Sequence, residues 1–229
     1  MSKGVLYGVG TGPGDPELLT IKAVRTIESC PVIAAPQTAD GAMVALDIVR
    51  GAVDLTGKAV IPVRFSMTRD VARRAAEHAS LVRELVAHLD AVRDVALLNL
   101  GDPSIYATFQ RIAPDVRARG FEARAIPGVP SFCAVAAALE RDLTPEMSSP
   151  LHIVRGGYDD VRRAISWPGT KVVMKARRSL ADTKCILREE GAFDGAELVE
   201  DCGLPGERVY RSVDDVPDRG SYFSTMVVR

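Results

Sequence analysis

Short apolar runs alternate along this chain with longer segments in which apolar residues recur at every third or fourth position. The first pattern is typical of buried strands and the second of amphipathic helices, so their alternation predicts an α/β fold. In the first half of the chain, the apolar runs predict strands at Val5–Val9, Val32–Ala35, Val95–Leu100 and Ala123–Ile126. The clearest helical pattern covers residues 69–90, and it makes His78 a packed helix residue.

An aspartate followed by a proline marks two expected helix starts. Asp15-Pro16-Glu17 supplies an N-cap, a proline in the first turn and an acidic residue near the positive end of the helix dipole. We expect this helix to bury Leu19, Ala23, Val24 and Ile27 on one face. Asp102-Pro103 repeats the pattern, which predicts a second helix starting near Pro103.

A change in pattern predicts the division of the chain into two domains. The small-residue segment Phe132–Leu139 reads as a helix, and the polar, proline-bearing stretch Arg141–Pro150 then interrupts the periodicity. We therefore expect one domain over residues 1–145 and a second over residues 146–229. In the second domain we expect helices around residues 158–166 and 180–190, and strands at Leu151–Val154, Lys171–Lys175, Ala196–Glu200 and Tyr222–Val228.

Composition and charge exclude several classes of protein. With 229 residues, of which 47% are apolar and 26% charged, the chain can bury a core in each of two domains. Its formal net charge of −1 disfavours a general nucleic-acid binder. The four cysteines form no CxxC pair, and the three histidines have no metal-ligand spacing. Without a leader or a membrane-length apolar run, we expect a cytoplasmic protein in the reduced state and no structural metal.

Three predicted strands of the first domain end in turns that contain glycine. These turns are Gly8–Gly14, Gly101–Asp102 and Pro127–Gly128. In an open α/β sheet, ligands bind at the carboxyl ends of the strands, where loops present free backbone N–H groups. Each turn alone is explained by a tight backbone conformation that suits glycine, but three together predict one site of cofactor size.

The first of these turns does not fit the known phosphate-binding loops. A GxGxxG pattern that starts at Gly8 meets Pro13 at the last glycine, and one that starts at Gly10 meets Asp15. The sequence contains no GxxxxGK[ST] motif, because Lys22 lies well inside the predicted helix. Asp15 also places a carboxylate where an anionic phosphate needs donors, so a nucleoside triphosphate is disfavoured.

The residues of these turns also resemble a known family. The resemblance rests on three segments: Leu6-Tyr7-Gly8-Val9-Gly10 through Gly12-Pro13-Gly14-Asp15-Pro16-Glu17-Leu18-Leu19-Thr20, Gly101-Asp102-Pro103-Ser104-Ile105-Tyr106, and Pro127-Gly128-Val129. Together they resemble the tetrapyrrole methylases, the S-adenosylmethionine-dependent enzymes of corrin and sirohaem synthesis. The resemblance covers essentially the whole chain. It implies two α/β domains, distinct from the Rossmann methyltransferase fold, with S-adenosylmethionine in the cleft between them, and usually a homodimer.

The same resemblance implies a set of cofactor-binding residues. They are Pro13, Leu100, Gly101, Asp102, Ile105, Tyr106, Pro130, Ser131, Phe132 and Met174, with Cys202 or Gly203 on the far side. Many relatives carry a small hydroxyl residue where this chain has Pro130, so Ser131 or the backbone must supply that hydrogen bond. Two assignments have a plain structural alternative. Asp102 also suits a helix cap, and Met174 also suits the core.

The resemblance extends to the acceptor. Phe65-Ser66-Met67-Thr68-Arg69, the segment from Gly101 to Thr108 and Tyr222-Phe223-Ser224-Thr225 are most similar to members that methylate precorrin-2 at C20 in cobalamin synthesis. Arg69 is our candidate for a carboxylate of this macrocycle, although an exposed helix arginine explains it equally well. Tyr106 suits either the macrocycle or the protein interior.

Methyl transfer to carbon is an in-line displacement that depends on positioning, so we expect no nucleophile, and Asp102 and Tyr106 are the catalytic candidates. Three alternatives remain: a cobalt-containing acceptor, another tetrapyrrole methylase of the same fold, and a tetrapyrrole carrier without catalytic activity. A fourth, an RNA methylase, is disfavoured by the acidic pI of about 6.3 and by Asp15.

Overall fold

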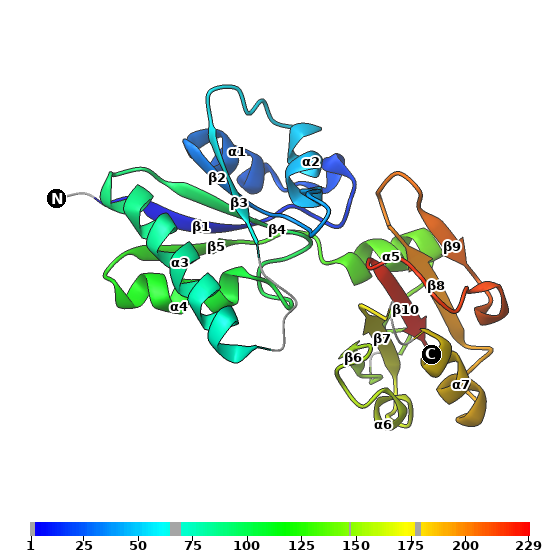
Figure 1. The fold of residues 1–229 in the computed structure, drawn as a ribbon. Coiled ribbons are helices and arrows are strands. Elements are labelled where there is room, and N and C mark those ends of the chain that lie inside the picture. Colours follow the sequence, from blue (N-terminus) through cyan, green and yellow to red (C-terminus); the bar gives the residue numbers. More distant parts are fainter. Residues whose placement is uncertain (1–2, 65–69, 147, 177–179) are drawn as a thin grey trace. The chain divides into compact units, whose positions relative to one another are not determined.

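The computed structural model describes residues 3–64, 70–146, 148–176 and 180–229. The chain forms two compact units, Met1–Pro130 and Ser131–Arg229, which we describe separately (Figure 1). The division at Pro130 comes earlier than the break expected near residue 145. The reason is that helix α5 (Ser131–Leu139) packs on the sheet of the second unit, with Val135 and Leu139 in a cluster with strand residues there.

The first unit contains a five-stranded parallel sheet with the order β3-β2-β4-β1-β5. The strands are β1 (Val5–Gly10), β2 (Val32–Pro36), β3 (Ala59–Val63), β4 (Val95–Asn99) and β5 (Glu122–Ile126). Because all five strands are parallel, their carboxyl ends lie at one edge of the sheet. The glycine turns that follow β1, β4 and β5 therefore leave from the same edge.

Helices cover both faces of this sheet (Figure 1). One apolar cluster joins the sheet to α3 (Val71–Asp90) and α4 (Phe109–Ala118). A second cluster on the other face joins it to α1 (Ile21–Ser29) and α2 (Val44–Arg50). The predicted long helix is confirmed as α3, where the half-buried His78 contacts Asp115 of α4 through Nε2 at 2.6 Å.

Neither Asp-Pro sequence begins an α-helix, although we expected a helix to start at each. After Asp15 the chain forms only the short 3-10 helix η1 (Pro16–Leu18), and α1 starts later, capped by Thr20, whose Oγ1 accepts a hydrogen bond from the Ala23 amide at 3.1 Å. The helix expected near Pro103 is wrong, since α4 begins at Phe109. Proline favours the first turn of a helix, but it does not determine that the helix continues.

The second unit has a mixed sheet with the order β6-β7-β10-β8-β9. The strands are β6 (Leu151–Arg155), β7 (Thr170–Met174), β8 (Ala196–Glu200), β9 (Arg208–Tyr210) and β10 (Ser224–Val228). The last strand, β10, lies between β7 and β8 and is antiparallel to both. An apolar cluster on one face of this sheet includes α6 (Val161–Ile165), α7 (Leu180–Glu189) and the 3-10 helix η2 (Val213–Asp215), while α5 covers part of the other face.

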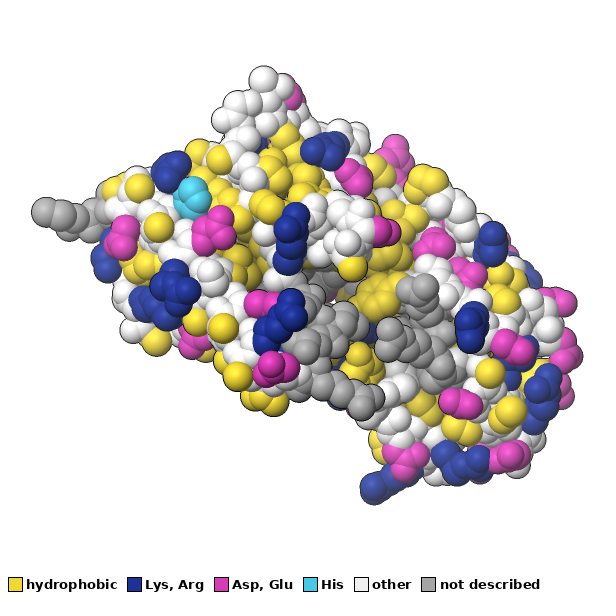
Figure 2. Space-filling view, in the orientation of Figure 1, with side chains coloured by type: hydrophobic (Ala, Val, Ile, Leu, Met, Phe, Trp, Pro, Cys, Tyr) yellow, Lys and Arg dark blue, Asp and Glu magenta, His cyan; other side chains and the backbone are white. Residues whose placement is uncertain are grey.

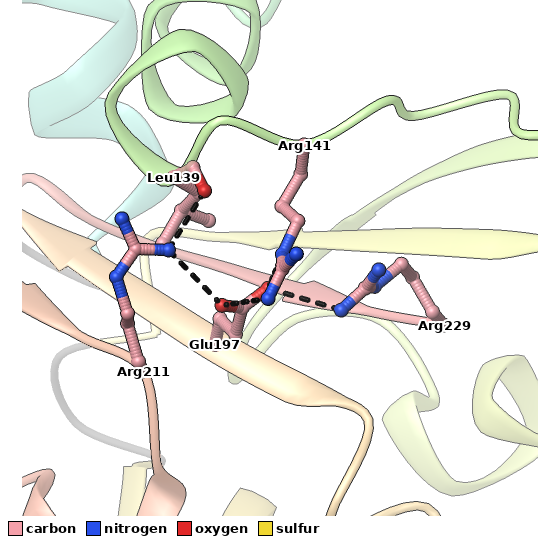
Figure 3. A network of polar contacts seen from close by, with 5 residues as sticks. All are labelled: Leu139, Arg141, Glu197, Arg211 and Arg229. Carbon is pink, nitrogen blue, oxygen red and sulfur yellow. Dashed lines mark hydrogen bonds and ion pairs between the residues drawn. The ribbon is translucent and has the colours of Figure 1, made fainter.

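A buried carboxylate ties α5 to this sheet (Figure 3). Glu197 of β8, whose side chain is 4% exposed, accepts hydrogen bonds from Arg141 Nε at 2.8 Å and from Arg229 Nη2 at 3.2 Å. Arg211 lies 3.8 Å from the same carboxylate and donates to the carbonyl oxygen of Leu139 at 2.8 Å. Guanidinium groups thus link the carboxyl end of α5 to β8 and to residues beside β9 and β10.

The surface carries charges of both signs. Lysine and arginine side chains are interspersed with aspartate and glutamate over the visible face of each unit (Figure 2). On this visible face the mixture of signs agrees with the formal net charge of −1. Among the helices in the described ranges, none has the length and apolar character that would let it cross a membrane.

Candidate functional site

The loops after β1 and β4 are joined by a short antiparallel bridge. The Gly101 amide donates to the carbonyl oxygen of Gly12 at 2.8 Å, and the Gly12 amide donates to the carbonyl oxygen of Gly101 at 3.3 Å. Thr11 extends this contact, because its amide donates to the carbonyl oxygen of Asn99 at 2.9 Å. The first two of the predicted corners therefore lie side by side.

The third loop packs directly against the other two. A Cβ atom on Gly128 would lie 2.4 Å from the carbonyl oxygen of Gly101 and 2.8 Å from the Cα of Gly10. A Cβ atom on Gly10 would lie 2.6 Å from the amide nitrogen of Gly128. No larger residue fits at these two positions unless the backbone moves, so the glycines permit the close approach of three chain segments. The expected convergence of the three corners is confirmed.

The side chain of Asp102 connects the second loop to the third. Its Oδ2 accepts a hydrogen bond from the Gly128 amide at 2.9 Å. Its Oδ1 accepts from the Ser104 amide at 2.7 Å and from the Ser104 hydroxyl. Burial alone would raise the pKa of this carboxyl, but the hydrogen bonds from Ser104 and Gly128 outweigh it and lower the pKa below its ordinary value. Asp102 is therefore ionised at neutral pH, and it caps a turn instead of a helix.

The loop between β4 and α4 contains a strained residue. Tyr106 has a φ of 50°, in the left-handed region that non-glycine residues seldom adopt, and 41% of its surface is exposed. Such a conformation costs of order 1 kcal/mol and is often found at functional sites. Tyr106 is thus an exposed residue of the loop and not part of the protein interior.

Sequence reasoning missed one residue that holds this loop in place. Asn99, at the end of β4, is 3% exposed. Its Oδ1 accepts a hydrogen bond from the Phe109 amide at 3.1 Å, and its Nδ2 donates to the carbonyl oxygen of Leu97 at 2.8 Å. A single amide inside an otherwise apolar run was the available signal, because a buried polar side chain needs partners.

The other predicted residues of the first unit lie on or beside these loops. Pro13 is buried and directly follows the bridge between Gly12 and Gly101. Leu100 and Ile105 are half-buried on the second loop, where the Ile105 amide donates to the carbonyl oxygen of Asp102 at 3.2 Å. Pro130, also half-buried, ends the third loop. The sheet thus brings the predicted residues of this unit to one edge.

In the second unit, strand β10 joins the strand ends where two predicted residues lie, so both are at one edge of the second sheet. Met174 pairs with Thr225 at the end of β7, and Cys202 lies just beyond the end of β8, whose Glu200 pairs with Ser224. Met174 and Cys202 are 9% and 8% exposed. The remaining predicted residues of the second unit lie at the start of a helix and beyond the end of a strand. Ser131 and Phe132 begin α5, and Gly203 follows Cys202 after β8.

The thiol of Cys202 is not available as a nucleophile. Burial, reinforced by the neighbouring Glu207 carboxylate, raises the pKa of the thiol to about 12, so the group stays protonated at neutral pH. Glu207 is fixed beside it, because its Oε2 accepts a hydrogen bond from the Gly203 amide at 2.6 Å. Cys202 therefore offers an uncharged, buried side chain at this end of the sheet.

Two further expectations concern other parts of the chain. Arg69 and the preceding segment 65–68 lie outside the described residues. In the described ranges no cluster of three or more histidine, cysteine, aspartate or glutamate side chains has a geometry suited to a metal ion.

The converging loops of the first unit offer an ionised carboxylate and backbone groups. These groups suit a ligand that carries ammonium or hydroxyl donors better than they suit a phosphate.

Known proteins are similar to this chain over nearly its whole length. A family model described as Tetrapyrrole (Corrin/Porphyrin) Methylases matches residues 5–215. The chain is 30% identical to cobalt-precorrin-2 C(20)-methyltransferase of Salmonella typhimurium over 98% of its own length and 96% of that protein. It is 27% identical to precorrin-2 C(20)-methyltransferase of a Sinorhizobium species, over 98% and 95% of the two chains.

Solved structures show the same fold. The cobalt-precorrin-4 methyltransferase CbiF superposes with a TM-score of 0.77, covering 98% of this chain and 94% of that one at 18% identity. The uroporphyrin-III C-methyltransferase of Thermus thermophilus superposes with a TM-score of 0.73 at 25% identity, covering 98% and 97% of the two chains. That structure was determined as a complex with S-adenosylhomocysteine.

Proposed function

The chain belongs to the tetrapyrrole (corrin/porphyrin) methylases, and from this premise we propose that it transfers the methyl group of S-adenosylmethionine to C20 of precorrin-2 or of its cobalt-containing counterpart. The observation that carries the proposal is the similarity, over nearly the full length of each chain, to two enzymes named for C20 methylation of these acceptors. The reaction belongs to cobalamin synthesis.

The converging loops of the first unit have the chemistry that S-adenosylmethionine requires. This molecule presents an ammonium group, ribose hydroxyls and a carboxylate, and when bound it supplies an electrophilic methyl group. Asp102 is ionised, and each of its carboxylate oxygens has more than one acceptor position, so it can accept from an ammonium or a hydroxyl while Gly128 and Ser104 hold it. Gly101 has no side chain, and its bridge with Gly12, next to Pro13, places backbone groups of two loops where they can contact the ligand.

In this proposal the protein works mainly by positioning. The methyl carbon leaves sulfur and bonds to C20, C20 loses a proton to water or to a weak base, and S-adenosylhomocysteine is released. The step needs no covalent enzyme intermediate, and the protonated thiol of Cys202 agrees with this. Holding the reacting atoms about 3–3.5 Å apart and in line supplies several kcal/mol of the barrier reduction. Asp102 and Tyr106 are the candidates for direct contact with the reactants.

The remaining contacts are proposed from family resemblance. They are cofactor contacts by Leu100, Ile105, Pro130, Ser131, Phe132, Met174, Cys202 and Gly203, and a substrate contact by Arg69. We also propose a homodimer that functions in the cytoplasm. The absence of a disulfide agrees with a reducing compartment, since all four cysteines are free.

One experiment tests the function and separates it from its rivals. The purified chain is incubated with S-adenosylmethionine and precorrin-2 without oxygen, S-adenosylhomocysteine is quantified, and the new methyl carbon is located by NMR. We expect stoichiometric S-adenosylhomocysteine and a methyl group at C20. A methyl group at another carbon would assign the chain to a different tetrapyrrole methylase. Binding of the macrocycle without S-adenosylhomocysteine release would show a carrier.

A further inference from the structure

A polar contact links the carboxyl ends of β2 and β3, at the same sheet edge as the glycine loops. Gln37 directly follows β2 and Arg64 directly follows β3. Arg64 Nε donates a hydrogen bond to Gln37 Oε1 at 2.5 Å. The backbone reinforces this pairing, because the Gln37 amide donates to the carbonyl oxygen of Val63 at 2.8 Å.

The half-buried side chain of Gln37 is itself held in place. Its Nε2 donates to the carbonyl oxygen of Gly41 at 3.0 Å, so the amide group is hydrogen-bonded on both sides. The turn that contains Gly41 is closed by the Thr38 amide, which donates to the carbonyl oxygen of Ala42 at 2.9 Å. Gln37 therefore presents a fixed carbonyl group to Arg64, and this lowers the entropy lost when the guanidinium group binds a ligand.

Arg64 keeps its full positive charge in this arrangement. Its partner is a neutral amide, and among the residues that the structure describes no aspartate or glutamate oxygen lies within ion-pair distance of it. The acidic residue of the neighbouring turn, Asp40, accepts a hydrogen bond from Thr38 instead. Some other exposed arginines of the unit are paired with carboxylates, as Arg50 is with Asp47 at 2.9 Å. With Nε engaged, the two Nη groups of Arg64 remain as a fork that suits a carboxylate.

The position of Arg64 suits a large acceptor molecule. In the strand order β3-β2-β4, neighbouring strands lie about 4.8 Å apart, so the end of β3 is about 10 Å from the end of β4, where Gly101 and Asp102 lie. A tetrapyrrole carries its carboxylates on side chains around the ring, several ångströms from each ring carbon. A carboxylate can thus reach β3 while the ring lies near the loop after β4.

We propose that Arg64, oriented by Gln37, binds a carboxylate of the tetrapyrrole acceptor. The inference rests on the proposed function, because it takes the polycarboxylated macrocycle as the ligand. Gln37 acts in it as a positioning residue that holds the guanidinium group without cancelling its charge.

Direct binding of uroporphyrin III, an octacarboxylated tetrapyrrole, tests the assignment in the full-length chain. Binding is followed by fluorescence, with S-adenosylhomocysteine binding measured by calorimetry in parallel. We expect Arg64→Gln to weaken porphyrin binding about tenfold, as for loss of one charge-assisted contact, with S-adenosylhomocysteine affinity within twofold of the wild type. The matched control Arg50→Gln removes another exposed arginine of the unit and should bind like the wild type.

A second variant separates charge from structure. Gln37→Glu keeps the contact with Arg64 but makes it an ion pair, so we expect porphyrin binding to weaken severalfold although Arg64 stays anchored. If the contact served only to hold the two strand ends together, Gln37→Glu would bind porphyrin as the wild type does, and this result overturns the inference. Unchanged binding by Arg64→Gln, or equal losses in Arg64→Gln and Arg50→Gln, also overturns it.

These readouts distinguish the inference from the proposed function. A wild-type chain that binds the porphyrin through Arg64 but releases no S-adenosylhomocysteine with precorrin-2 contradicts the methyltransferase function and supports the role of Arg64. A chain that methylates C20 with equal KM in the wild type and in Arg64→Gln supports the function and contradicts the role of Arg64. Absence of saturable porphyrin binding by the wild type contradicts the inference.

Discussion

Gly10 and Gly128 come from different strand ends, and their backbones touch: a Cβ on Gly10 would lie 2.6 Å from the amide nitrogen of Gly128. The same added atom would lie 2.7 Å from the carbonyl oxygen of Gly101. These obstacles are backbone atoms of the two loops that follow β4 and β5, so one methyl group added at the end of β1 disturbs the contact among all three chain segments.

We therefore expect Gly10→Ala to lower the free energy of unfolding by about 1–3 kcal/mol and to abolish measurable S-adenosylhomocysteine binding. Urea unfolding and calorimetric titration measure the two effects. Gly57→Ala is the control, because a Cβ there meets open space but the φ of 78° strains the backbone. It should cost about 1 kcal/mol and leave binding intact. Wild-type binding by Gly10→Ala would contradict the geometry of the site.

The ionised carboxylate of Asp102 predicts a defined pH dependence. Its pKa is lowered in the folded chain, so its contribution to stability is fully present above the ordinary aspartate pKa and is lost as the pH falls through the lowered value. Asp102→Asn should therefore be less stable than the wild type from pH 8 to pH 5, and the difference should shrink below about pH 4. Urea unfolding across this range measures it. A difference that grows at low pH would contradict a lowered pKa.

The left-handed backbone of Tyr106 predicts that its replacement by glycine costs little stability. Glycine adopts this conformation without strain, and this relief offsets part of the loss of the tyrosine side chain, so Tyr106→Gly should destabilise the chain by less than about 0.5 kcal/mol. Tyr158 is also exposed, at 69%, but does not have a positive φ, so Tyr158→Gly should destabilise the chain by about 1 kcal/mol. If Tyr106 contacts the reactants, Tyr106→Gly also lowers kcat, which S-adenosylhomocysteine release measures. Equal destabilisation by the two variants would show that position 106 stores no strain.

Glu197 is predicted to contribute more to stability than an exposed ion pair does. Glu197→Gln removes the charge that the guanidinium groups of Arg141, Arg211 and Arg229 share, and should cost about 1–3 kcal/mol. The control Glu122→Gln breaks an exposed pair with Arg124 and should cost less than about 0.5 kcal/mol. Thermal unfolding compares the two variants. Equal costs would show that burial of Glu197 adds nothing.

The apolar runs of the sequence predicted the buried strands well, because a strand covered on both faces is apolar throughout. Strand β3 was missed for the opposite reason: it lies at the sheet edge, contains Pro62, and leaves most of its residues exposed. Strand β9, which is short and exposed, and the short helix α2 were missed as well. Weak periodicity over a few residues does not distinguish these elements from loops.

The features of the candidate site also fall into those that the sequence predicted and those that it did not. The glycine corners are local features and were predictable, whereas the role of Asp102 depends on Gly128, which is distant in sequence and adjacent in space. The sequence pattern around Asp102-Pro103 does not reveal this partner. The contact between Gln37 and Arg64 has no local signal at all, since it exists only because β2 and β3 are neighbours.

The position of β10 has a consequence for synthesis on the ribosome. Residues 224–228 are made after the other strands of the second sheet, yet they form its middle. Until they emerge, β7 and β8 each expose an unpaired edge that other chains can join. The second unit therefore completes its fold only after residues 224–228 have left the ribosome, and a nascent chain stalled before residue 224 is expected to depend on chaperones.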